Sequence, residues 1–140
     1  MIHARQAMDT CTAPPMQQLV ARFLADGHAD AHLATLRGEY HRRKIGLQHA
    51  LHDELAGLDA AWTDPRGGFF LWLTLPPEID TGALFAIALE EGVAFIPGPA
   101  FSIGGRFSNA LRLAFSAEPP DRAREGARRL GRAIDRLLSA

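Results

Sequence analysis

The residues at 109–116 combine one charge with a pattern that is typical of a buried β-strand. Arg112 lies inside this run, between the apolar residues Leu111 and Leu113. Burying a guanidinium group is costly unless an anion meets it. Arg112 therefore needs a carboxylate, which either an Asp or Glu of the protein supplies in a structural salt bridge or a bound ligand carries.

A pair of histidines has a spacing that can bind a metal. His28 and His32 are four residues apart on a predicted helix, but no third ligand follows at a suitable distance. We expect them to be surface histidines.

The last predicted helix is rich in arginine, with Arg122, Arg124, Arg128, Arg129, Arg132 and Arg136. Acidic residues interleave with these arginines, and the segment has no aromatic side chain. We therefore expect a solvated helix face rather than a surface for nucleic acid.

The apolar spacing predicts the helices that must position these side chains. An apolar stripe over 16–24 begins after two prolines and stops near Gly27, and a second helical period covers 30–58. Asp80 is expected to cap a third helix that ends at Gly92. A last helix is expected to open near Asp121.

Three apolar runs predict strands, at 69–75, 93–96 and 111–115. The first is rich in aromatic residues, and we expect it to be buried on both faces. Together the elements indicate an α+β fold, with a small sheet of about three to four mainly antiparallel strands covered by helices. A long helix of the kind that bridges two domains precedes this sheet.

Three parts are expected along the 140 residues. Residues 1–29 form a helical segment from the end of a large domain that this chain does not contain, 30–58 form the bridging helix, and 59–140 form a small C-terminal domain. The chain is long enough to bury one core of its own.

The composition limits the classes of partner and the compartment. The formal net charge is -1, so the chain has no overall field to attract nucleic acid or an anionic membrane. No apolar run approaches the roughly 20 residues of a membrane span. The single cysteine, Cys11, fits a reducing compartment, and the N-terminus lacks the apolar core of a signal peptide, so we expect a cytoplasmic protein.

Three motifs together resemble a known family: GGFFLWL at 67–73, GVAFIPGPAF at 92–101 and LRLAFS at 111–116. Their order is similar to the C-terminal part of class I/II aminotransferases, the fold-type I enzymes that use pyridoxal 5′-phosphate. The resemblance is greatest to the 2-aminoadipate and kynurenine aminotransferase branch. Residues 9–51 resemble the segment after that family's cofactor-binding lysine, together with its interdomain helix.

The resemblance implies a substrate-closing domain of an enzyme that transfers an amino group between an amino acid and a 2-oxo acid. Arg112 would hold the α-carboxylate of the substrate by two parallel hydrogen bonds. Phe69 and Phe70 are candidates for a wall of the substrate pocket, with core packing as the alternative. These three are the only substrate-binding residues we expect here.

No catalytic, cofactor-binding or metal-binding residue is expected on this chain. The one lysine, Lys44, lies in a cationic patch of the long helix, outside the serine-rich context of the family's cofactor lysine. We expect it to be a solvated surface lysine. The complete enzyme would use pyridoxal 5′-phosphate, none would be held covalently by this chain, and the chain alone would be inactive.

Two other functions remain open. One is a non-catalytic regulatory module, because an aminotransferase-like domain is also fused to a winged helix-turn-helix in a family of bacterial transcriptional regulators. The other is an interaction domain that pairs with a separately encoded large domain. The first two helices should expose apolar residues, so we expect self-association or a homodimer.

Overall fold

The structure of the chain is a computed structural model that describes residues 7–8 and 13–139. Cys11 and residues 1–6, on which part of the expectation about the compartment rests, lie outside the described residues. The chain consists of two compact units, residues 1–38 and residues 39–140.

The first unit contains α2 (Pro14–Ala25), which includes the two prolines in its first turn, whereas the sequence predicts a start directly after them. Proline suits the first turn of a helix because N–H groups there have no intrahelical acceptor, so a residue without an N–H group loses no hydrogen bond. The helix ends before Gly27, whose φ of +76° is readily adopted by glycine. No residue of α2 is buried, and its exposed apolar side chains are Met16, Leu19, Val20, Phe23 and Leu24. The expected exposure is confirmed, and self-association stays a prediction.

The long helix α3 runs over His28–Glu54, where the sequence predicts 30–58. Its part beyond Gly38 belongs to the second unit and buries Leu47, Ala50 and Leu51. The helix ends before Leu55, which is also buried but contacts the core from the turn that follows.

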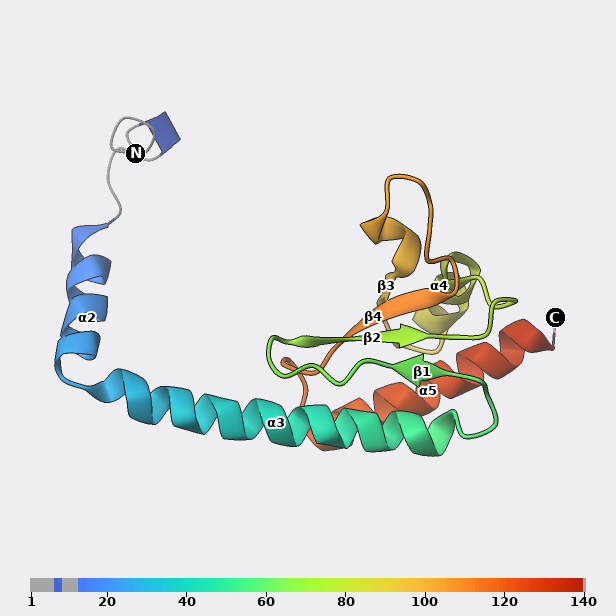
Figure 1. Cartoon of the computed structure of the whole chain (residues 1–140), viewed down its shortest axis with the longest axis horizontal. Helices are drawn as coiled ribbons and strands as arrows, with labels where there is room; N and C mark the ends of the chain where they lie inside the picture. The colour runs from blue at the N-terminus through green and yellow to red at the C-terminus, as the bar shows by residue number, and fades with distance from the viewer. Residues whose placement is uncertain (1–6, 9–12, 140) are drawn as a thin grey trace. The chain divides into compact units, whose positions relative to one another are not determined.

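A four-stranded antiparallel sheet forms the centre of the second unit (Figure 1). Its strands are β1 (Ala61–Trp62), β2 (Phe70–Thr74), β3 (Ile96–Pro97) and β4 (Ala110–Ala114). The order across the sheet is β1-β2-β4-β3, which confirms the predicted α+β fold. The two-residue strand β1 is absent from the sequence prediction, and β3 is shorter and later than the predicted 93–96.

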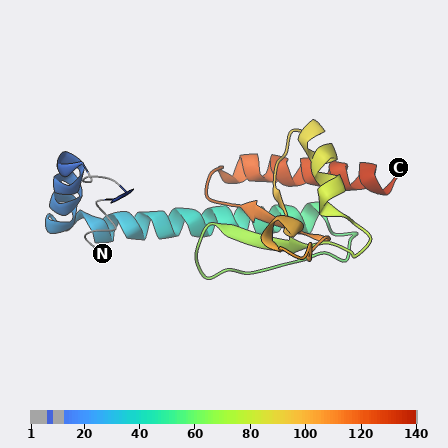
Figure 2. The same ribbon diagram turned by 90° about the horizontal axis from the view of Figure 1, so that it is seen from above.

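The helices of this unit cover one face of the sheet (Figure 2). These are the end of α3, α4 (Thr81–Glu90) and α5 (Pro120–Leu138). Alternate strand residues are buried beneath them, namely Leu71, Leu73, Leu111 and Leu113. The predicted burial of 69–75 on both faces is wrong. The Phe70 side chain is 42% exposed, because the described helices cover only the opposite face.

The start of α4 is tied to the loop that leads into β4. Asp80 caps the helix as predicted, since its Oδ1 accepts a hydrogen bond of 2.8 Å from the Ala83 N–H. The buried hydroxyl of Thr81 donates to the Ser108 carbonyl over 2.8 Å. The Asn109 side-chain amide donates to the Leu75 carbonyl at 2.5 Å. These bonds fix the point where β4 begins.

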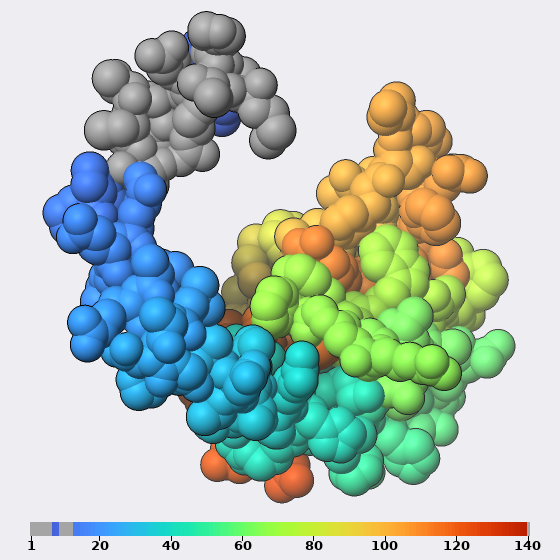
Figure 3. Space-filling view, turned by 60° about the vertical axis from the view of Figure 1, so that its left-hand side comes forward, coloured from blue at the N-terminus to red at the C-terminus, as the bar shows by residue number. Residues whose placement is uncertain are grey.

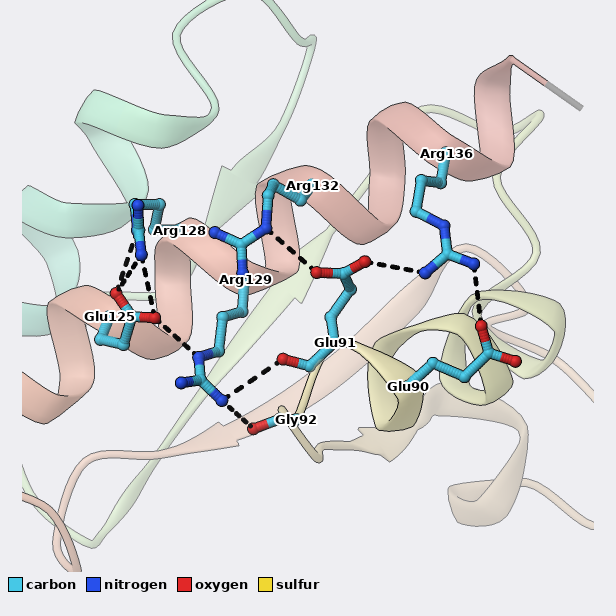
Figure 4. Close-up of polar contacts among 8 residues, drawn as sticks. All are labelled: Glu90, Glu91, Gly92, Glu125, Arg128, Arg129, Arg132 and Arg136. Atoms are coloured by element: carbon cyan, nitrogen blue, oxygen red, sulfur yellow. Dashed lines mark hydrogen bonds and ion pairs between the residues drawn. The ribbon is translucent and has the colours of Figure 1, made fainter.

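Ion pairs join α5 to the end of α4 (Figure 4). Arg132 and Arg136 lie 3.0 Å and 2.7 Å from the Glu91 carboxylate, and Arg129 donates to the Gly92 carbonyl. The hydrogen bond from Arg136, followed by that from Arg132, holds the pKa of Glu91 below its ordinary value. The arginine-rich face is solvated, as predicted, and it also has a structural role that its composition alone did not reveal.

Candidate functional site

Arg112 lies on the face of the sheet that the helices leave uncovered. Leu111 and Leu113 point into the core, so the side chain between them points the other way. The register places Trp72 of β2 and Ile96 of β3 opposite Arg112, one on each side. Arg112 is therefore in the middle of a row that crosses three strands, and its side chain is half-buried.

Two aromatic rings contact the guanidinium group of Arg112. Its central carbon lies 4.0 Å from the centre of the Phe70 ring and 4.9 Å from the centre of the Phe101 ring. The Phe101 ring also meets Trp72 at a tilted, near edge-on angle, with 5.4 Å between ring centres. Phe70, Trp72 and Phe101 are here called the aromatic cage.

The segment 98–107 brings Phe101 into the aromatic cage. It begins with the 3₁₀ helix η1 (Gly98–Phe101), directly after β3. Gly98 is buried, and a Cβ atom there would overlap the carbonyl oxygens of Phe107 and Ala110, so only glycine fits. Phe107 adopts a φ of +68°, and the centre of its ring lies 5.6 Å from the centre of the Trp72 ring. Figure 3 shows this segment, gold to orange, standing out from the rest of the second unit.

None of the acidic residues that the structure describes forms an ion pair with Arg112. The first alternative from the sequence, a structural salt bridge between Arg112 and an Asp or Glu, is therefore not found among the described residues. A guanidinium group carries five N–H donors in one plane, and two parallel ones match the geometry of a carboxylate. The site is thus a cation whose ring contacts leave its donors unpaired among the described residues.

The two candidate pocket residues lie in different surroundings. Phe70 belongs to the aromatic cage, where it contacts Arg112. The Phe69 ring instead lies 5.3 Å from Tyr40 of α3 and 6.4 Å from Phe70, between ring centres. The structure thus brings Phe70 and Arg112 together directly, while Phe69 is linked to Arg112 through Phe70.

Lys44 is not the solvated surface lysine that the sequence predicts. Its side chain is 12% exposed, and its Nζ lies 2.6 Å from Oδ1 of Asp64 and donates to the Pro65 carbonyl over 3.2 Å. Hydrogen bonds from Lys44 and then Gln48 hold the pKa of Asp64 below its ordinary value. Asp64 and Pro65 belong to the loop after β1, which contacts α3 at Lys44. The helical spacing of the apolar residues in α3 does not predict this tertiary contact.

The residues of this chain do not fit a covalently held pyridoxal 5′-phosphate. Attachment needs a lysine amine that can form a Schiff base. The ammonium group of Lys44 is paired with Asp64, and its other polar partner is the Pro65 carbonyl rather than a residue of the aromatic cage. No chemical step on that cofactor is therefore assigned to these residues.

The other candidate sites have no ligand geometry. His28 and His32 are exposed and lie 5.7 Å and 6.0 Å from the Phe23 ring, between ring centres. Across residues 7–8 and 13–139, no cluster of three or more potential metal ligands is found. None of the helices in this described part is both long and apolar enough to cross a bilayer.

A family model described as aminotransferase class I and II matches residues 3–130. The chain belongs to the class I and II aminotransferase family. The matched range includes every residue of the aromatic cage and Arg112. The resemblance expected from the three sequence motifs is therefore confirmed.

A sequence comparison and a structure comparison illustrate the similarity. The chain is 37% identical over 99% of its length to a 2-aminoadipate transaminase of Thermus thermophilus, and it covers 34% of that protein. The crystal structure of LysN, an α-aminoadipate aminotransferase from Thermus thermophilus, superposes with a TM-score of 0.88 and 37% identity. That superposition covers 99% of this chain and 35% of LysN, which was solved with N-(5′-phosphopyridoxyl)-L-leucine. The chain thus spans about a third of the length of these relatives.

The similarity extends to regulators of transcription. The HTH-type transcriptional regulator TauR of Rhodobacter capsulatus is 35% identical over 86% of this chain, which covers 25% of TauR. Membership in the family therefore does not by itself separate an enzyme from a regulator.

Two members of the site, Trp72 and Phe101, are absent from the sequence prediction. Successive side chains of a strand point to opposite faces, so residues two apart share a face. Interpreting 69–75 as a strand with one buried and one exposed face would therefore have placed Phe70 and Trp72 on the same face. The motif that contains Phe101 was identified, but its approach to Arg112 depends on the turn after β3. Nothing local in the sequence specifies that approach.

Proposed function

We propose that this chain is the C-terminal, substrate-closing domain of an aminotransferase, and that Arg112 holds the α-carboxylate of the amino acid or 2-oxo acid. The observation that carries the proposal is an arginine that is half-buried among aromatic rings, without an ion pair among the described residues. Leaving a charge in such a position has a cost, and a ligand carboxylate offsets it.

The planar guanidinium group gives this role its geometry. Two parallel hydrogen bonds fix both the position and the rotation of a carboxylate. Fixing the carboxylate also limits where the α-amino group can lie, which contributes to rate by orienting the reacting atoms. Phe70 forms a wall beside the carboxylate, and Phe69 supports Phe70 from the side of α3.

The remaining chemistry belongs to the complete enzyme. There, pyridoxal 5′-phosphate would supply the carbonyl that accepts the amino group, held by residues outside this chain. We also propose that this chain alone does not transaminate, and that the complete protein is a cytoplasmic homodimer. The substrates would be an amino acid and a 2-oxo acid.

The kinetic test compares Arg112→Ala with Arg124→Ala in the complete protein. Arg124 is an exposed arginine of α5 without an ion pair or hydrogen bond among the described residues, so its loss controls for charge. Each hydrogen bond to a charged group contributes roughly 1.5–3 kcal/mol, so Arg112→Ala should raise KM and lower kcat/KM by about 100-fold or more. The absorbance of the bound cofactor should stay unchanged. Unchanged kinetics in Arg112→Ala would remove the proposal.

A second function, a regulatory domain, is favoured by the similarity to TauR. The coding sequence upstream of this segment separates the two functions. A cofactor-binding domain alone supports the enzyme, whereas a winged helix-turn-helix ahead of that domain supports the regulator.

A further inference from the structure

The two aromatic rings that contact Arg112 come from elements on either side of β4. Phe70 lies on β2, and Phe101 lies in η1, which directly follows β3. In the sheet, β4 is between these two strands. We propose that Phe70 and Phe101 are positioning residues, which hold the Arg112 guanidinium so that its N–H groups are presented to the substrate carboxylate. This inference rests on the proposed function of Arg112.

An arginine side chain can be held in place in more than one way. An ion pair or hydrogen bond would fix the guanidinium but would use the donors that a ligand needs. A ring face attracts the cation through its quadrupole, and this attraction uses no N–H group. Distances of 4.0 Å and 4.9 Å from the guanidinium carbon to the two ring centres are within the range for such contacts. Arg112 is thus fixed while its donors stay available.

The rings also limit the directions from which a ligand can bind. The donors of a guanidinium group lie in its plane, and a ring above the carbon covers part of a face. A carboxylate therefore gains access along an edge, where two parallel hydrogen bonds form. Rings also exclude water from the group, which strengthens its electrostatic interaction with an anion.

The rings themselves are held by the fold. Phe70 pairs with Ala114 in the register of β2 and β4, and the Phe69 ring packs against it at 6.4 Å. Phe101 meets Trp72, the residue directly opposite Arg112, at 5.4 Å. The tight approach at Gly98 fixes the start of η1. The two rings are therefore placed before any ligand arrives.

The first test observes Arg112 without any ligand, by nitrogen-15 NMR of arginine side chains in the 140-residue chain. Ring currents should shift the Arg112 Nε–H proton upfield of the other arginines. Phe70→Leu and Phe101→Leu should each move it downfield, and Phe70→Tyr, which keeps a ring, should retain the shift. Phe85→Leu is the matched control, because it removes a ring contact with Phe95 in the core instead. An Arg112 signal that is unshifted, or that Phe70→Leu and Phe101→Leu leave in place, would overturn the proposal.

The second test measures kinetics in the complete protein. Phe70→Leu and Phe101→Leu should each raise KM for the amino acid by about 3- to 30-fold, the range that one cation–π contact supports. The rate with the amine that has the same side chain but no carboxylate should not change. A purely structural defect would instead lower the rates with the amino acid and with the amine. Phe70→Tyr should restore KM.

The two proposals fail in different ways. If Arg112→Ala impairs the enzyme and both leucine variants match the wild type, the positioning role is wrong and the proposed function stands. If Arg112→Ala leaves KM and kcat/KM unchanged, the proposed function of Arg112 is wrong. The positioning role of Phe70 and Phe101 is then wrong as well, because it depends on that function.

Discussion

The guanidinium carbon of Arg112 lies 4.0 Å from the centre of the Phe70 ring. Arg112 is on β4 and Phe70 is on β2, and the register places them diagonally on the same uncovered face. The sequence predicts that burying the Arg112 charge is costly, and it predicts that the strand containing Phe70 is buried. In the structure these two side chains contact each other. This contact explains how the fold tolerates Arg112 without an ion pair among the described residues.

The stability of the Arg112→Met variant separates a ligand site from a structural salt bridge. Breaking a buried salt bridge typically costs about 3–5 kcal/mol. Removing Arg112 loses only its ring contacts, and methionine retains part of the packing, so the free energy of unfolding should fall by no more than about 2 kcal/mol. Urea unfolding of the chain measures this, and a loss of the larger size would favour the salt bridge.

Gly98→Ala tests the tight turn that carries Phe101. The added Cβ would overlap the carbonyl oxygens of Phe107 and Ala110, which are backbone atoms and cannot rotate away. Overpacking of this kind typically costs about 1–3 kcal/mol. Gly104→Ala is the control, because its Cβ would meet nothing within 4 Å. Equal unfolding midpoints for the two variants would contradict the role given to Gly98.

Asn109→Ala tests the start of β4. The Asn109 amide donates to the Leu75 carbonyl, and Leu75 is buried. The variant leaves that carbonyl without this donor, which should lower the free energy of unfolding by about 1–3 kcal/mol. Ser108→Ala keeps the carbonyl that Thr81 uses, so thermal denaturation should show little change for it. A larger loss in Ser108→Ala than in Asn109→Ala would be inconsistent with this bond pattern.

Glu91→Gln tests the link between α4 and α5 through pH. Arg136, and to a lesser extent Arg132, hold the pKa of Glu91 below its ordinary value of 4.5. A carboxylate with a lowered folded-state pKa stabilises the fold above about pH 4.5, and this contribution is lost as pH falls through the folded-state pKa.

The wild type should therefore exceed Glu91→Gln in stability at about pH 7, and the gap should narrow by about pH 3. Urea unfolding at both values measures it. Glu78→Gln is the control, since Glu78 is exposed and has no ion pair among the described residues. A gap that does not depend on pH would exclude the ion pairs as its cause.

Local patterns predicted the elements that local forces specify. The prolines at the start of α2, the Asp80 cap of α4 and the start of α5 near Asp121 each follow from one segment of the sequence. The strand β1 did not, because two residues carry too little periodicity. It forms by pairing with β2, which no pattern in 61–62 indicates.

The site was predictable only in part, and the reason is tertiary. Arg112 stands out because its type conflicts with its strand. Phe70 was identified from a motif, but its contact with Arg112 depends on strand order and on which face the helices cover. Phe101 reaches the cage through the turn at Gly98, and Lys44 is paired through a returning loop. Each of these contacts joins segments that are distant in sequence.

The most direct test of the central claim compares an amino acid with the amine that has the same side chain but no carboxylate. In the complete protein, Arg112→Ala should lower kcat/KM for the amino acid by about 100-fold or more. For the amine, kcat/KM should stay within about threefold of the wild type, because Arg112 has no carboxylate to bind there. An equal loss for both substrates, or no loss for the amino acid, would contradict the assignment of Arg112 as the carboxylate-binding residue.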